Sequence, residues 1–138
     1  MIELNLTTRH RDHWLEITSE VERIIEQHQW KDGTVTIYVP HTTAGVTINE
    51  NADAHVTADL IQALQKLVPW EDNYRHAEGN TAAHLKASLM GASQTLLLRN
   101  GRWQRGTWQG LYFCEFDGPR QRKVWIQFHP DINRCHID

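Results

Sequence analysis

Hydrophobic and polar residues alternate along several short stretches of the chain, a pattern typical of strands that bury one face. Together with apolar runs rich in β-branched residues, this pattern predicts seven strands, over Ile2–Thr8, His13–Ile17, Thr34–Val39, Thr43–Ile48, Ser93–Leu98, Trp108–Phe116 and Lys123–Phe128. We expect the first two strands to pair with each other across the turn at Arg9–Asp12. Pro40 separates the third strand from the fourth, because proline has no backbone N–H for the ladder. Asp117-Gly118 is the predicted turn between the last two strands.

Apolar residues recur at helical spacing in three other segments. The predicted helices are one capped by Ser19, with Glu22 placed as in a capping box, one over Ala54–Leu67, and one over Ala82–Met90 that Thr81 caps and Gly91 stops. The second helix carries one apolar stripe and ends before Pro69. We expect this stripe to lie in the protein core.

These elements predict an α+β fold, a two-sheet β-sandwich of about seven strands with about three helices covering one side. The 138 residues are enough for one domain with a real core, so we expect a single domain over residues 1–138.

Charge, cysteine content and hydropathy exclude several classes of protein. The net charge is −3 and the basic residues are scattered, which argues against a dedicated nucleic-acid binder. The chain shows neither a signal segment nor an apolar run of membrane-spanning length, so we expect a cytoplasmic protein that does not bind membranes. Cys114 and Cys135 form no CxxC pair, and we expect both thiols to be reduced.

A first polar cluster, His41–Asp53, crowds ionisable and amide side chains around a short strand. His41 is expected at the rim of the fold, where one strand ends and the next begins. Side chains such as Asn49 and Asn51 are rarely buried without partners, so their number here favours a site. Asp53 has an equally good alternative role as the N-cap of the helix that begins near Ala54.

A second polar cluster, residues 73–84, places two histidines on either side of a turn. His84 falls in the first turn of a predicted helix, where the positive end of the helix dipole disfavours an imidazolium. A neutral imidazole suits general-base catalysis or metal coordination. The spacing of His76 and His84 does not match a compact zinc signature, so an ordinary surface or hydrogen-bonding role stays open for each.

A third polar cluster, residues 99–110, alternates arginines with tryptophans and glycines. Arginine binds phosphate or carboxylate through two parallel hydrogen bonds, and an indole can stack on a flat ring. Arg105, Thr107 and Gln109 are therefore candidates for contacts to a phosphate. The alternative is a β-hairpin loop with solvated arginines and with tryptophans packed on the sheet.

Several segments agree in order and spacing with one known family and together span nearly the whole chain. They are His41–Ala44, Thr47–Asp53, Tyr74–His76, Glu78–Asn80, Ala83–Gly91 and Gly106–Gly110. In these segments the chain resembles the YjbQ family of small trimeric proteins, described as secondary thiamine-phosphate synthases. The resemblance implies the two-sheet fold, a homotrimer packed through its sheets, and a small phosphorylated metabolite as partner. A trimer would also bury aromatic surface in a chain with six tryptophans.

The reaction implied by the resemblance joins two heterocycles. An aminopyrimidine methyl group loses pyrophosphate, and the ring nitrogen of a thiazole phosphate attacks the carbon left behind. This chemistry needs no protein nucleophile, but it needs stabilisation of the leaving group, exclusion of water and orientation of two rings. Arginine or lysine, stacking surfaces and a divalent ion, Zn²⁺ or Mg²⁺, would supply these.

The resulting hypothesis assigns roles to ten residues. The predicted metal ligands are His41, His76, His84 and Asp53. The predicted catalytic residues are His41, His84 and Glu115, and the predicted substrate contacts are Asn49, Asn51, Arg105, Thr107 and Gln109. Two other functions stay open at this point. One is a trimeric protein that binds a phosphorylated metabolite without turnover, and the other is a metal-dependent phosphate-ester hydrolase.

Overall fold

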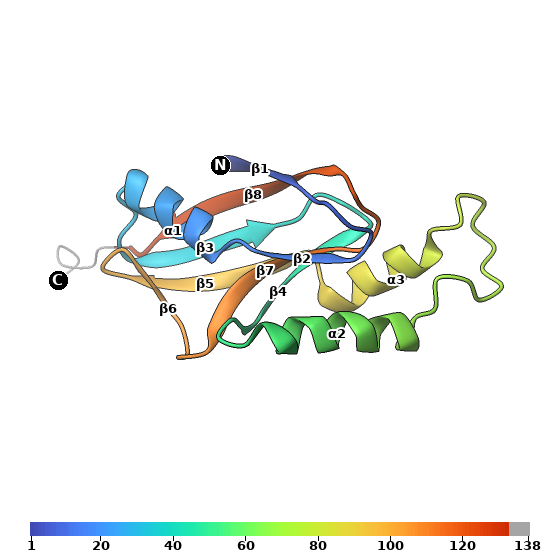
Figure 1. Cartoon of the computed structure of the whole chain (residues 1–138). Coiled ribbons are helices and arrows are strands. Elements are labelled where there is room, and N and C mark those ends of the chain that lie inside the picture. Colours follow the sequence, from blue (N-terminus) through green and yellow to red (C-terminus); the bar gives the residue numbers. More distant parts are fainter. Residues whose placement is uncertain (133–138) are drawn as a thin grey trace.

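Two antiparallel sheets and three helices make up residues 1–132, the part of the chain that this computed structural model describes (Figure 1). Sheet A has the strand order β1 (Ile2–Thr7), β8 (Gln121–Pro130), β3 (Gly33–Tyr38), β5 (Ser93–Arg99) and β6 (Arg102–Gln104). Sheet B has the order β2 (His13–Glu16), β7 (Gln109–Glu115) and β4 (Ala44–Glu50). The helices are α1 (Thr18–Gln27), α2 (Ala54–Leu67) and α3 (Thr81–Met90). The predicted α+β fold with two sheets and three helices is confirmed.

The main core lies between the two sheets and α1. Side chains alternate along β3, so Val35 and Ile37 are fully buried while Tyr38 is exposed on the other face of sheet A. Neighbouring strands and α1 complete this core with Val21, Ile24, Ile25, Val46, Leu96, Leu98, Leu111, Phe113, Val124 and Ile126. The sheets are thereby held face to face, and the connections between them lie at the ends of the sandwich.

A second apolar cluster lies on the opposite face of sheet B, which α2 and α3 cover (Figure 1). Tyr112 and Cys114 of β7 belong to this cluster and pack with Ala83 and Ala87 of α3. Cys114 is a buried free thiol, and Cys135 lies outside the described residues. Because α3 is packed against sheet B, its N-terminal residues have fixed positions relative to the ends of the strands.

The strand pairing differs from the sequence prediction at two places. β1 pairs with β8 and β2 pairs with β7, so the first two strands belong to different sheets. Asp117-Gly118 also links β7 of sheet B to β8 of sheet A and is not a hairpin turn. Both predictions were wrong because an alternating pattern shows which face of a strand is buried but not which strand lies beside it.

Three connections between the sheets meet at one end of the sandwich. They are residues 8–12, 39–43 and 116–120. Backbone hydrogen bonds join them to one another: Gly118 donates to Arg11 at 3.1 Å, Thr8 donates to Arg120 at 2.9 Å, and Phe116 donates to Thr43 at 3.2 Å. This end of the molecule is therefore a rigid frame built from three segments that are distant in sequence.

Two helix starts differ from the prediction. Ile17 is the N-cap residue of α1 and makes no side-chain capping bond, and Ser19 lies inside the helix. The Thr18 hydroxyl is used across the fold, where it accepts a hydrogen bond from the Leu111 amide at 2.9 Å. α3 follows Asn80 rather than Thr81, again without a side-chain cap. Its predicted stop is confirmed, because Gly91 has a φ of 92° that favours glycine.

α2 has the predicted bounds, but its apolar stripe is not fully buried. No residue of this helix is buried, and Leu67 is 76% exposed. Leu64 packs against the second apolar cluster, and no further layer covers α2 within residues 1–132. The prediction of a core stripe is corrected to a stripe that rests on the protein surface.

The third polar cluster begins as a β-hairpin, the alternative that the sequence left open. β5 and β6 pair across Asn100 and Gly101, which have positive φ values of 52° and 75°. β6 has only three residues with two exposed side chains, so its sequence carries no strand pattern. It raises the strand count to eight within the described residues, against the seven predicted.

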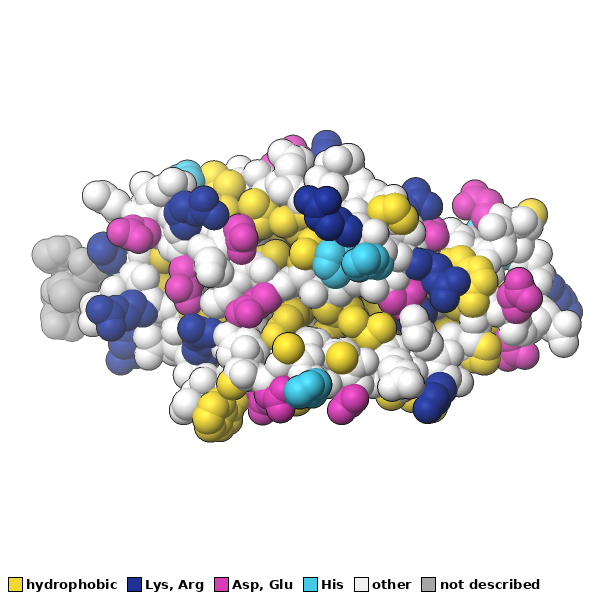
Figure 2. Space-filling model, viewed as in Figure 1, with side chains coloured by type: hydrophobic (Ala, Val, Ile, Leu, Met, Phe, Trp, Pro, Cys, Tyr) yellow, Lys and Arg dark blue, Asp and Glu magenta, His cyan; other side chains and the backbone are white. Residues whose placement is uncertain are grey.

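The molecular surface shows no concentration of one charge on the face of Figure 2, where lysines and arginines alternate with acidic side chains. Within residues 1–132 no helix is long and apolar enough to cross a bilayer.

Candidate anion-binding site

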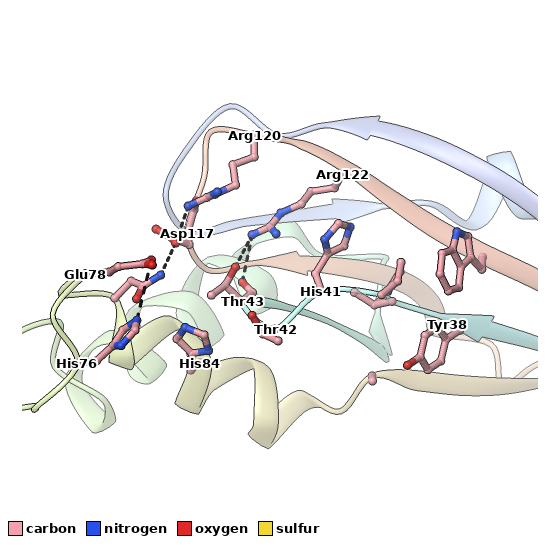
Figure 3. A pocket seen from close by; sticks show the side chains of 15 residues that line it. Tyr38, His41, Thr42, Thr43, His76, Glu78, His84, Asp117, Arg120 and Arg122 are labelled. Carbon is pink, nitrogen blue, oxygen red and sulfur yellow. Dashed lines mark hydrogen bonds and ion pairs between the residues drawn. The ribbon is translucent and has the colours of Figure 1, made fainter.

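An open pocket of about 730 Å³ lies at the end of the sandwich where the three connections meet (Figure 3). Its lining comes from the end of β3, the β3–β4 and β7–β8 connections, the segments before and after α3, α3 itself and β8: Tyr38, Val39, Pro40, His41, Thr42, Thr43, His76, Glu78, Asn80, His84, Ala92, Asp117, Arg120, Arg122 and Trp125. Figure 3 shows both arginines reaching in from one side and His84 from α3 on the other. The volume is within the range of roughly 300–1,000 Å³ that is typical of small-molecule sites.

Arg122 is held in the pocket wall by a buried carboxylate. Its Nε donates to Glu115 Oε1 at 2.7 Å, its Nη2 pairs with Glu115 Oε2, and Nη2 also donates to Thr43 Oγ1 at 2.8 Å. Arg122 is 5% exposed and Glu115 is fully buried. None of the hydrogen bonds within residues 1–132 uses Arg122 Nη1, which leaves this group for a ligand in the pocket.

Glu115 is ionised, and its hydrogen bonds explain why. Burial alone would raise the pKa of this carboxyl group, but hydrogen bonds from Arg122, the Asp117 amide and the Thr8 hydroxyl outweigh burial and lower the pKa. Thr8 Oγ1 donates at 2.8 Å, and the Phe116 and Asp117 amides donate at 3.1 and 3.0 Å. A carboxylate with this many donors is a poor proton acceptor. Glu115 therefore positions Arg122.

Arg120 belongs to a second, more exposed network. Its Nε donates to the Asp117 carbonyl at 2.7 Å and its Nη2 to Asp117 Oδ2 at 2.8 Å. Asn80 Nδ2 donates to the same Oδ2 at 2.9 Å, which fixes the orientation of this amide. Asn80 Oδ1 is buried in the pocket wall and has no partner within the described part of the chain. The site thus offers one free acceptor among its donors.

The neutral form of His41 is favoured by its surroundings. Burial and the nearby positive charge of Arg122 lower the pKa of this imidazole. The Lys123 amide donates to His41 Nε2 at 2.9 Å, so the neutral ring carries its proton on Nδ1. His41 can therefore donate one hydrogen bond to a ligand without carrying a charge.

The two other histidines of the pocket face each other. The rings of His76 and His84 are 5.5 Å apart between centroids and nearly perpendicular, at 87°. His76 Nε2 is 3.9 Å from Glu78 Oε2. At the pocket margin Tyr38 stacks on Trp125 with ring centroids 5.8 Å apart. Guanidinium groups, imidazole donors and a flat aromatic surface together suit an anion attached to a flat ring.

Comparison with known proteins places this chain in a family. The family model described as "UPF0047 protein YjbQ-like" matches residues 2–131. The chain belongs to the YjbQ family. It is 51% identical to the UPF0047 protein YugU of Bacillus subtilis over 125 residues, which cover 90% of this chain and 95% of YugU. It is 45% identical to the UPF0047 protein MJ1081 of Methanocaldococcus jannaschii, with 95% of each chain covered.

Solved structures of the YjbQ family have the same fold. The crystal structure of a YjbQ/UPF0047 protein from Clostridium acetobutylicum is 48% identical, with a TM-score of 0.91, and the match covers 94% of this chain and 100% of that one. The protein TT1486 of Thermus thermophilus is 40% identical, with a TM-score of 0.87 and the same coverage. Both are described as uncharacterised or hypothetical. These relatives therefore establish the fold, and the activity must be inferred from the residues of the site.

In this YjbQ-family chain, some of the predicted site residues lie together. His41, His76 and His84 all line the pocket. Glu115 lies behind the wall, where it holds Arg122. Arg120 and Arg122 were missed by the sequence reasoning. Their spacing of two residues after a Gly-Pro turn was the available signal, because it puts both side chains on one face of a strand.

The remaining predicted residues lie elsewhere. β4 starts next to the pocket at Ala44 and ends at Glu50, so Asn49 and Asn51 are about 17 and 23 Å from Ala44 along the chain at roughly 3.3 Å per residue. Asn51 Nδ2 donates to Glu16 Oε2 at 2.9 Å.

Arg105 and Thr107 precede β7, and Gln109 is its first residue, which pairs with Glu50 at the far end of β4. Arg105 Nη1 donates to the Gln109 carbonyl at 2.6 Å, and the Gly106 amide donates to Gln109 Oε1 at 2.8 Å. None of these three residues lines the candidate pocket.

The predicted metal ligands do not form one coordination site. No group of three or more His, Cys, Asp or Glu side chains within residues 1–132 is arranged to hold a metal ion. The Nε2 lone pair of His41 accepts the Lys123 amide, and Asp53 does not line the pocket. Residues 1–132 therefore do not fit a bound Zn²⁺ or Mg²⁺ as predicted, and no step below depends on one.

Asp53 is instead the N-cap of α2, the alternative role given above. Its Oδ1 accepts a hydrogen bond from the His55 amide at 2.9 Å. We expect Asp53→Ala to lower the free energy of unfolding by about 0.5–2 kcal/mol in urea denaturation. Asp59→Ala, at an exposed site on the same helix, serves as the control and should change it by less than about 0.5 kcal/mol. Equal effects of the two substitutions would contradict the capping role.

Proposed function

We propose that the pocket binds the phosphate or pyrophosphate group of a small metabolite that also carries a flat ring. The observation that supports this most strongly is the guanidinium group of Arg122, which buried Glu115 holds in place and whose Nη1 makes no hydrogen bond within residues 1–132. Arg120 lies beside it and is half-exposed. The neutral His41 adds an uncharged donor. Asn80 Oδ1 would accept a hydrogen from a hydroxyl or amino group of the same ligand.

We further propose that the chain acts on this ligand as a thiamine-phosphate synthase. The bond between the pyrimidine methylene carbon and the pyrophosphate oxygen breaks, and its electron pair leaves with pyrophosphate. The lone pair of the thiazole nitrogen then forms the new C–N bond, so nothing is oxidised or reduced. Arg120 and Arg122 would stabilise the charge that develops on the leaving group, a task for which fixed guanidinium groups are suited. They replace Arg105, Thr107 and Gln109 as the proposed phosphate contacts.

The test is formation of thiamine phosphate by the pure protein, given the pyrimidine pyrophosphate and the thiazole phosphate. We expect turnover in the parent protein and a loss of about 10²-fold or more in His84→Ala, in the range for removal of one group that contacts the reacting atoms. His55→Ala is the matched control, because the His55 side chain is 92% exposed on α2, and it should keep full turnover.

No turnover in the parent, with the pyrimidine pyrophosphate still bound, would favour the second candidate, a protein that binds a phosphorylated metabolite without transforming it. That candidate is supported by the same contacts and by the full set of hydrogen bonds on Glu115, which makes this buried carboxylate a poor base. Metal-dependent phosphate-ester hydrolysis is not proposed, since the residues do not fit the metal that it would need.

We also propose that the chain forms a homotrimer through the outer face of sheet A. The exposed side chains of Tyr38 and Leu97, at 44% and 60%, support this face. Light scattering should give three times the chain mass of 16.1 kDa. Leu97→Lys should lower that mass, while Leu67→Lys on the surface of α2 should not. A protein that is monomeric at all concentrations would contradict the trimer.

A further inference from the structure

A second, smaller hollow of about 330 Å³ adjoins the candidate pocket. It lies over the face of α3 and the start of β4 and is lined by His41, Thr42, Ala44, His84, Ala87, Ser88, Gly91 and Ala92. Four of these residues, His41, Thr42, His84 and Ala92, also line the larger pocket. The two hollows therefore share a boundary, and both histidines proposed to act on the ligand lie on it.

The two hollows differ in chemistry. The larger one contains Arg120 and Arg122, whereas the lining of the smaller one includes no lysine, arginine or carboxylate. Apart from the shared residues, the smaller hollow is made of small side chains, and its one additional hydroxyl, Ser88 Oγ, already donates to the His84 carbonyl at 2.9 Å. A charged group placed there would find no charged side chain in the lining to pair with.

The floor of the smaller hollow is rigid. Ala44 and Ala87 are buried, and the Val46 amide donates to the Gly91 carbonyl at 3.1 Å. A Cβ atom on Gly45 would be 2.8 Å from the same carbonyl, so β4 and the end of α3 are already at closest approach. The hollow is thus a fixed space bounded by small residues, of a kind that accepts a compact uncharged group.

We infer that one ligand spans both hollows, with its phosphate or pyrophosphate in the larger one and a compact, uncharged ring in the smaller one. His41 and His84 then flank the bond between the ring system and the phosphate group. This inference rests on the proposed anion site and deepens it, because it assigns ligand selectivity to the smaller hollow. Ser88, which lines only that hollow and is exposed, is the residue at which the selectivity can be changed.

The test compares two probes by calorimetric titration: inorganic pyrophosphate, which needs only the larger hollow, and the aminopyrimidine methyl pyrophosphate, which needs both. The parent protein should bind the ester about 10- to 100-fold more tightly than inorganic pyrophosphate, from burial of the ring. Ser88→Leu fills the smaller hollow. It should remove that advantage and leave the affinity for inorganic pyrophosphate unchanged.

Ser19→Leu is the matched control, since Ser19 is also an exposed helical serine but lies on α1 and lines neither hollow. It should bind both probes as the parent does. Equal affinity of the parent for the two probes, or an unchanged ester affinity in Ser88→Leu, would overturn the inference while leaving the anion site in place. Failure of the parent to bind inorganic pyrophosphate would instead overturn the proposed anion site, and with it this inference.

Discussion

Replacement of Arg122 by methionine is expected to lower the free energy of unfolding at pH 7 by about 3–5 kcal/mol. Arg122 and Glu115 form an ion pair that is nearly inaccessible to water, with exposures of 5% and 0%. The substitution leaves the Glu115 carboxylate buried beside an apolar side chain. Its remaining hydrogen bonds, from Thr8 and two amides, do not neutralise the charge. Urea denaturation measures the loss.

The dependence of this loss on pH identifies its cause. In the parent protein the pKa of Glu115 is lowered from 4.5, so its contribution to stability is present above about pH 4.5 and is lost as pH falls through the lowered value. Without Arg122 the burial of the carboxyl group dominates and raises the pKa of Glu115. The variant therefore binds a proton at Glu115 as pH falls, and the cost in stability of a buried, unpaired charge disappears. The difference in stability between the two proteins should therefore shrink as pH falls.

Two further variants complete the test of the ion pair. Glu115→Gln combined with Arg122→Met removes the buried charge and should recover much of the stability that Arg122→Met alone loses. Arg102→Met, at an exposed position on β6, should change the free energy of unfolding by less than about 0.5 kcal/mol. A loss in Arg122→Met that stays constant between pH 7 and pH 4, or that the second substitution does not relieve, would contradict the account.

Substitution of Arg120 by glutamine is expected to weaken the binding of inorganic pyrophosphate by about 10- to 100-fold. Hydrogen bonds to a charged group contribute roughly 1.5–3 kcal/mol each, and about 1.4 kcal/mol corresponds to tenfold in affinity. The side chain of Arg120 is 51% exposed in its pair with Asp117, so stability should change by about 1 kcal/mol or less. Calorimetric titration therefore reports a binding effect in a folded protein.

Arg102→Gln is the matched control for this prediction. Arg102 is an exposed arginine that does not line the candidate pocket, so its loss changes the net charge by the same amount without removing a proposed contact. It should leave the affinity nearly unchanged. Equal weakening by both substitutions would indicate a general charge effect. No weakening by Arg120→Gln would remove Arg120 from the site.

Local patterns in the sequence predict the elements of the fold well. Apolar and β-branched runs mark seven of the eight described strands within a few residues, because each of these strands packs at least one face against a core. The bounds of α2 and its Asp53 cap are also predicted, since capping depends on residues adjacent in sequence. β6 is missed because its three residues, of which only Trp103 packs against the core, are too few to show a repeating pattern.

The assembly of the site depends on contacts that local patterns do not contain. Arg122 and Glu115 are seven residues apart and lie on strands of different sheets, so their pairing follows from how β7 crosses to β8. The histidines could be predicted as candidates from their residue type, because a neutral imidazole can act as a general base or bind a metal. The amides and the aspartate at the far end of β4 were grouped with them because they are close in sequence, although a seven-residue strand separates them in space.

The most direct test of the anion site is a proton–nitrogen NMR spectrum of the histidine side chains during a titration with inorganic pyrophosphate. The chain has nine histidines, and only His41, His76 and His84 line the candidate pocket within the described residues. Signals are assigned with single histidine variants. We predict saturable shifts of these three rings, while exposed histidines such as His55 stay in place. Shifts confined to other histidines, or none up to millimolar pyrophosphate, would contradict an anion site at this end of the sandwich.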